Sequence, residues 1–126
     1  MTPLPIKVTA LAAIYLLISV TATHAITGDE WRQLPELPQK AYVSGVLDAW
    51  FHVAKLSQAV KEANPSYTPG AMERHFAPIT DCTQYRMSYG QVYAIVAKYV
   101  SQNPEHWHNG MPSLIWTAMS KGCSSP

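Results

Sequence analysis

The sequence has few charged residues and no excess of either sign. Asp, Glu, Lys and Arg make up 13% of its 126 residues, against about a quarter in an average globular protein. Nine Lys and Arg oppose eight Asp and Glu, which gives a formal net charge of +1. Nucleic acids are bound through clustered basic residues that displace counterions, and anionic membrane surfaces through polybasic segments. The composition therefore predicts no nucleic-acid partner and no electrostatic attachment to a membrane.

The sequence also lacks an apolar run long enough to cross a bilayer. Its N-terminal run, residues 8–20, has 13 residues, and as a helix these cover about 20 Å of a hydrocarbon core about 30 Å thick. Lys7 precedes the run, while Thr23 and Ala25 place small residues after it. This order is typical of a cleavable Sec-type signal peptide over residues 1–25 rather than of an uncleaved anchor. We therefore expect a single domain of residues 26–126, periplasmic or secreted, with no stable membrane anchor after cleavage.

Cysteine is scarce, with Cys82 and Cys123 the two in the chain. Structural zinc sites take four Cys or His ligands at short spacings, which this pair does not supply. In an exported chain an even cysteine count is typical of a disulfide, and two cysteines allow one intramolecular pairing. Closing a loop of about 40 residues is expected to add about 4 kcal/mol to the free energy of unfolding.

No segment alternates apolar and polar residues over the length of a strand, and ten prolines separate segments of helical periodicity. The sequence therefore predicts an all-α fold, a small bundle of four to five helices. Thr27 with Glu30, and Ser88 with Gln91, have the form of capping boxes that begin helices. Further helices are expected over residues 39–63, over residues 70–76 and from Pro112 onward, the last one capped by Gly122.

The middle of the chain is expected to be irregular. The helix over residues 70–76 should end before Pro78, because proline inside a helix removes a hydrogen bond and clashes with the preceding turn. Residues 79–87, including Cys82, then form a connection. The helix that begins at Ser88 and the final helix are joined by a short loop, so they should pack antiparallel. The Cys82–Cys123 disulfide is expected to close the open end of that hairpin.

The residue types of a hydrolytic triad occur at Ser44, Asp48 and His52. In a triad the histidine lies between the nucleophile and the acid, with oxyanion donors nearby. Three side chains on one helical ridge with the aspartate in the middle do not converge in that way. We therefore predict no catalytic residue and no enzymatic activity, with this ridge facing water.

Histidines and aromatic residues gather in the segment before the last helix. The segment His106-Trp107-His108, with Glu105 beside it and His75 elsewhere, does not have the ligand spacing of a structural zinc site, so no metal site is predicted. Nothing in the sequence indicates a cofactor. Trp31 and Trp107 lie near helix breaks, where aromatic side chains either remain exposed as interface anchors or cap the core. The candidate partner contacts are Trp107, His108, His106 and Trp31.

The pattern Tyr42-Val43-x-Gly45-x-x-Asp48-Ala49 resembles a motif of the Tai family of type VI secretion immunity proteins. The later run resembles that family too, and it comprises Cys82, Gly90-Gln91, Val96-x-Lys98-Tyr99-Val100, Asn103-Pro104-Glu105, Ala118 and Cys123. The resemblance implies a periplasmic protein that binds a peptidoglycan-amidase effector and neutralises it by occluding its active site. Such a protein needs surface complementarity and no chemistry of its own.

Two other classes of function stay open at this point. One is a periplasmic acid-stress chaperone of the HdeA type, which is also helical with one disulfide and exposes apolar surface on acidification. The other is an envelope protein with a structural or interaction role. The residues also leave a homodimer open.

Overall fold

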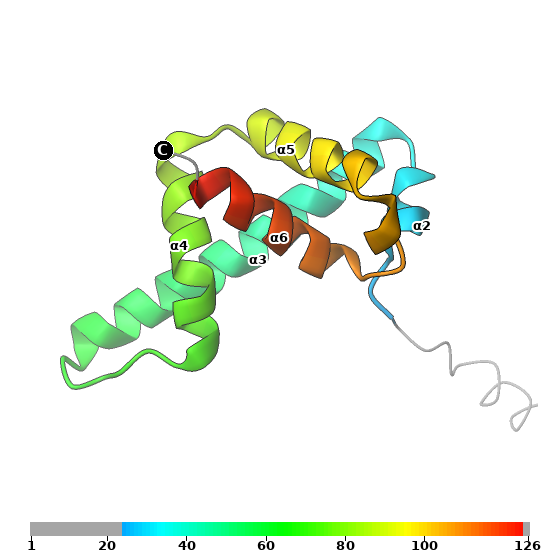
Figure 1. The fold of residues 1–126 in the computed structure, drawn as a ribbon. Helices are drawn as coiled ribbons and strands as arrows, with labels where there is room; N and C mark the ends of the chain where they lie inside the picture. Colours follow the sequence, from blue (N-terminus) through cyan, green and yellow to red (C-terminus); the bar gives the residue numbers. More distant parts are fainter. Residues whose placement is uncertain (1–23, 125–126) are drawn as a thin grey trace, which may run out of the picture.

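A computed structural model describes residues 24–124 of the chain (Figure 1). Within this range the predicted all-α fold is confirmed, and an isolated β-bridge between Thr27 and Gly110 is the one β-type pairing. The elements are α2 (Gly28–Arg32), α3 (Glu36–Ala63), α4 (Ala71–Arg86), α5 (Tyr89–Gln102), a 3₁₀ helix η1 (Pro104–His106) and α6 (Met111–Ser124). None of these helices is long and apolar enough to span a bilayer. The expected signal peptide lies outside the described residues, except for its last two.

Helix α2 begins as predicted. The Thr27 hydroxyl accepts from the Glu30 backbone N–H, and the Glu30 carboxylate accepts from the Thr27 N–H at 2.7 Å. These hydrogen bonds hold the pKa of Glu30 below its usual value, the Thr27 backbone N–H being the main cause. The backbone of this segment also bonds to the chain before α6, with Gly28 N–H donating to the Asn109 carbonyl. α2 is thereby fixed to the start of α6.

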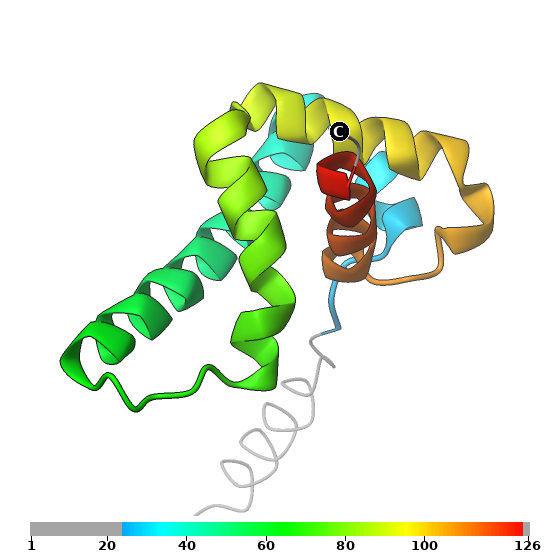
Figure 2. The same ribbon diagram turned by 60° about the vertical axis from the view of Figure 1, so that its left-hand side comes forward.

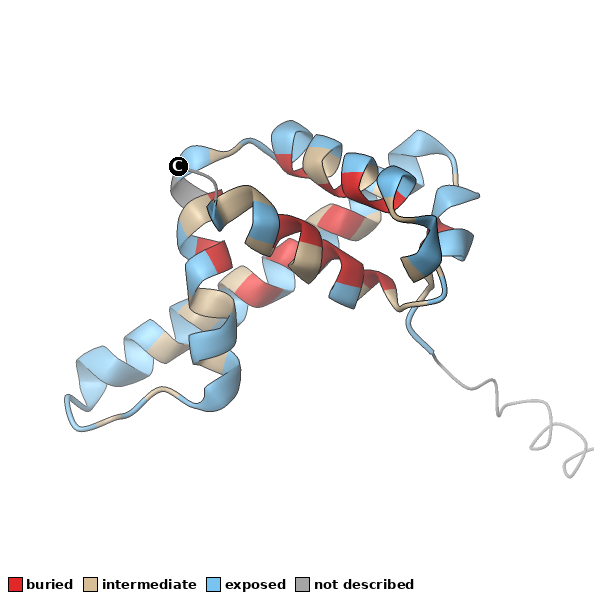
Figure 3. Ribbon diagram, in the orientation of Figure 1, coloured by how far each residue is buried: buried red, intermediate tan, exposed pale blue. Residues whose placement is uncertain are grey.

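Helix α3 is the longest element and starts at Glu36, three residues earlier than predicted. Its buried residues are Val43 and Leu47 in the first half and Trp50 at the midpoint. Its second half leaves the body of the molecule and is accompanied by α4 alone, so that the two helices form a projecting hairpin (Figures 1 and 2). Figure 3 shows buried residues concentrated in the body and exposed ones along this hairpin.

Helix α4 contradicts the prediction for residues 70–87. It continues through Pro78 to Arg86, so residues 79–87 are mostly helical rather than irregular. Tertiary packing holds the turn that follows the proline, since Ile79, Thr80 and Thr83 are all buried. The buried hydroxyls of the two threonines are satisfied by donating to carbonyls one turn back. The local preference of Pro78 for a helix end is outweighed by these contacts.

The disulfide joins Cys82 and Cys123, as predicted, across a sequence separation of 41 residues. Because Cys82 lies within α4, the bond ties α4 to the end of α6 rather than closing the α5–α6 hairpin. Gly122 is not a cap, because α6 continues through it to Ser124. At that position a Cβ would make ordinary contact with Ile95 of α5, so Gly122 is accommodated as a helical residue beside α5.

The core lies where α5 and α6 pack against the first half of α3. Ser88 caps α5 as predicted, and the Gln91 side chain accepts from the Ser88 N–H. Buried residues at the helical spacing expected from the sequence are Val92, Val96, Tyr99 and Val100 of α5 and Leu114, Ile115, Ala118 and Met119 of α6. Met111, one residue before the expected start of the last helix, is buried with them.

Candidate binding surfaces

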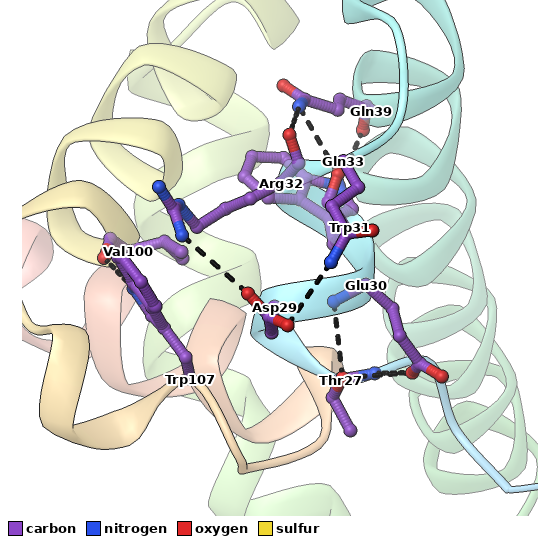
Figure 4. A network of polar contacts seen from close by, with 9 residues as sticks. All are labelled: Thr27, Asp29, Glu30, Trp31, Arg32, Gln33, Gln39, Val100 and Trp107. Carbon is purple, nitrogen blue, oxygen red and sulfur yellow. Dashed lines mark hydrogen bonds and ion pairs between the residues drawn. The ribbon is translucent and has the colours of Figure 1, made fainter.

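The structure removes Trp31 from the candidate contact residues. Trp31 is 2% exposed, so of the two alternatives that the sequence left open, burial against the core is the one observed. The indole N–H donates to the Gln39 carbonyl at 3.2 Å, and the Gln39 amide donates back to the Trp31 carbonyl (Figure 4). Trp31 anchors α2 to the start of α3, because burial of its ring is combined with a satisfied polar atom.

Trp107 is half-buried and fixed on both sides. Its indole N–H donates to the Val100 carbonyl at 2.7 Å, and the Arg32 guanidinium lies 3.3 Å from its ring centroid (Figure 4). Asp29 in turn lies 3.7 Å from the Arg32 guanidinium. A cation held over an indole in this way is worth about 0.5–1 kcal/mol at an exposed site. Trp107 therefore covers the core beneath α2 and presents little ring surface to a partner.

The two histidines beside Trp107 are at the surface. His108 is exposed, and His106 lies 3.7 Å from the Glu105 carboxylate. Among the described residues, no group of three or more His, Cys, Asp or Glu side chains is placed to hold a metal ion. His75 belongs to α4, where its ring stacks on Trp116 with centroids 4.5 Å apart. Of the four candidate contacts, His108 and His106 keep accessible side chains.

Two members of the Ser44, Asp48 and His52 ridge, Asp48 and His52, are exposed as expected, and both lie at the edge of a hollow. The Tyr89 hydroxyl, from the start of α5, donates to the Asp48 carboxylate at 2.5 Å. This hydrogen bond is the main cause that raises the pKa of Tyr89. The contact joins residues 41 positions apart, which is why helical spacing alone did not indicate it.

The hollow has a volume of about 380 Å³ and lies between α3, the end of α4 and the start of α5. Its lining is Leu47, Asp48, Phe51, His52, Lys55, Thr83, Met87, Tyr89 and Val92. Leu47 and Val92 are buried core residues and form its floor. Asp48, His52 and Lys55 are exposed and form one edge. The sequence indicated the exposed edge but not the hollow, because residues 79–87, which supply Thr83 and Met87 to its lining, were expected to be irregular.

The projecting hairpin carries exposed apolar side chains. Val53, Leu56 and Val60 follow one another at spacings of three and four residues along α3, and their exposed fractions are 37%, 54% and 45%. These three residues form one helical stripe, which we call the α3 stripe. Met72, at the start of α4, is 63% exposed. The hairpin thus combines a projecting shape with apolar surface that no described part of the chain covers.

The tip of the hairpin is held in shape by Glu73. Its carboxylate accepts from the Tyr67 hydroxyl at 2.7 Å and from the Gly70 N–H. The Tyr67 hydrogen bond is the main cause that lowers the pKa of Glu73. Between the two helices lies a groove of about 450 Å³ whose lining includes Lys61, Arg74 and Asp81. The tip is therefore an ordered loop rather than a loose connection.

In a comparison with known proteins, no family model, no curated protein and no solved structure matches this chain.

Proposed function

We propose that the protein is an exported binding protein and that it neutralises a peptidoglycan-amidase effector by occluding the active site of that enzyme. The effector is the partner implied by the resemblance to the Tai family. The exposed apolar residues of the projecting hairpin are the observation that favours binding to another protein. The proposal needs no catalytic group in this chain.

Shape and chemistry of the hairpin both support an occluding role. An active site is a concave surface, and a projecting element fits it better than a flat one. Helices commonly bind grooves through apolar side chains at spacings of three, four and seven residues. Val53, Leu56 and Val60 have this arrangement, and they lie on the part of α3 that has left the core.

The test compares two identical substitutions on one helix. Leu56→Asp places a charge in the α3 stripe, and Leu37→Asp places the same charge at the other end of α3, where Leu37 is 77% exposed. The protein, exported through its own leader and purified with its disulfide, is used to recover partners from the producing organism. We expect to recover one amidase at a fixed molar ratio to the protein, and we expect the recovered amidase to have lost its wall-degrading activity. Leu56→Asp should weaken that complex at least tenfold, since burying an unpaired charge in an interface is costly, and Leu37→Asp should leave it unchanged.

Other outcomes would overturn parts of the proposal. If both variants retain full inhibition, the hairpin is not the interface, and His108→Ala then tests the surface beside Trp107. Recovery of no partner at neutral pH, with many unrelated envelope proteins at acid pH, would favour the chaperone of the HdeA type instead.

A further inference from the structure

The hollow between α3, α4 and α5 has the build of a ligand site. Its volume of about 380 Å³ falls within the range of small-ligand pockets, about 300–1,000 Å³. Its floor is apolar, formed by Leu47 and Val92 with Phe51 and Met87 beside them. The buried Thr83 hydroxyl in its lining is already satisfied, because it donates to the Ile79 carbonyl at 2.7 Å. A ligand would therefore meet an apolar floor and find its polar partners at the edge.

Charges of opposite sign stand at the two ends of that edge. Asp48 and Lys55 lie on one side of α3, seven residues apart, which corresponds to about 10 Å along a helix. Side chains three or four residues apart on a helix can form an ion pair, but Asp48 and Lys55 are too far apart to do so. Among the described residues, Asp48 bonds to the neutral hydroxyl of Tyr89, and no carboxylate lies within ion-pair distance of Lys55. Each end of the hollow thus presents one charge without a charged partner.

From this arrangement we propose that the hollow binds a short peptide with free termini and an apolar side chain. Its ammonium group would bind Asp48 and the Tyr89 oxygen, and its carboxylate would bind Lys55, with His52 between them. Its apolar side chain would lie on Leu47, Phe51 and Met87. A tripeptide spans about 10 Å when extended, which matches the separation of the two charged residues along α3. This site lies on the polar side of α3, away from the α3 stripe, and the inference does not depend on the proposed function.

The experiment uses Ala-Leu-Ala and its three capped forms as probes, which are the N-acetyl peptide, the C-terminal amide and the peptide with both caps. Each is titrated into the disulfide-bonded protein, and binding is followed by amide chemical shifts in two-dimensional NMR. We expect saturable shifts at residues around the hollow. Each cap should weaken binding about fivefold, the size of one exposed ion pair.

Two variants assign the ends of the peptide. Asp48→Asn should weaken binding of the free peptide and of the amide but not of the N-acetyl form. Lys55→Met should weaken binding of the free peptide and of the N-acetyl form but not of the amide. Lys61→Met removes the same charge from α3 outside the hollow and should change nothing. Amide spectra of the free variants establish that each one is folded.

The proposal is overturned if no peptide gives saturable shifts at millimolar concentration, or if the shifts fall elsewhere. Equal binding of the doubly capped peptide would also overturn it, and would indicate that an internal segment of a partner protein occupies the hollow. Loss of binding in Lys61→Met to the same extent as in Lys55→Met would show attraction by overall charge without a site.

Discussion

At the scale of single residues, Gly28 and Gly45 differ in whether their surroundings leave room for a side chain. A Cβ at Gly28 would lie 2.6 Å from a Leu114 methyl group and 3.2 Å from the Trp107 backbone. The methyl group can turn away, but the backbone is fixed by the hydrogen bond from Asp29 N–H to the Trp107 carbonyl. A Cβ at Gly45, in the middle of α3, would meet nothing within 4 Å. Gly28 therefore permits α2 to approach the chain before α6, and Gly45 only weakens a helix.

We accordingly predict opposite effects for the same substitution at these two positions. Gly28→Ala should lower the free energy of unfolding by about 1–3 kcal/mol through overpacking. Gly45→Ala should raise it by about 0.5–1 kcal/mol, because alanine loses less backbone entropy in a helix. Urea denaturation of both variants against the parent protein measures this directly. Changes of the same sign in the two variants would contradict the packing described for α2.

At the scale of elements, Pro78 is an internal residue of α4 that local preference opposes. It supplies no N–H to the carbonyl of the preceding turn. We predict that Pro78→Ala restores that hydrogen bond and raises the free energy of unfolding by about 1 kcal/mol. Replacing proline also increases the conformational entropy of the unfolded chain, which lowers stability, but the gain in helix stability is expected to be larger. Thermal unfolding followed by circular dichroism measures the change. A lower melting temperature would mean that the packing of α4 on α6 depends on the proline.

Local signals explain which elements were predicted correctly. Thr27 and Ser88 begin helices through hydrogen bonds to residues three positions away, so their effect can be recognised in a short stretch of sequence. The second half of α4 is helical through contacts with distant parts of the chain, including the bond from Cys82 to Cys123. No local pattern carries that information. The hollow escaped prediction for the same reason, because its lining residues come from α3, α4 and α5.

Trp31 shows the same limit for a single side chain. Its position near a helix break is compatible both with exposure and with burial. The Gln39 carbonyl that accepts its indole N–H lies eight residues away, across the turn between α2 and α3. The geometry of that turn, rather than the composition around Trp31, decides that the ring is buried.

At the scale of the whole molecule, the disulfide is the one covalent link across the fold. It joins α4, which supports the projecting hairpin, to the end of α6. We predict that Cys82→Ser with Cys123→Ser lowers the free energy of unfolding by about 4 kcal/mol, mainly by releasing a constraint on the unfolded chain. Chemical denaturation with and without reductant measures this. Reduction should lower the free energy of unfolding of the parent protein by the same amount and should leave that of the double variant unchanged. An unchanged midpoint on reduction would mean that helix packing alone fixes α4.

The pairing of α2 with the segment before α6 has a consequence for the order in which the chain assembles. The Ile26 carbonyl accepts from the Met111 N–H at 2.7 Å, and the N–H groups of Gly28 and Asp29 donate to carbonyls of residues 109 and 107. Residues 26–29 are synthesised first in the domain, but the residues that hydrogen-bond to their backbone, 107–111, are synthesised almost last. Burial of Trp31 should therefore be a late event of folding, completed after the whole chain has emerged. Under the proposed export, such late closure would keep the leading end of the domain unfolded while the chain crosses the membrane.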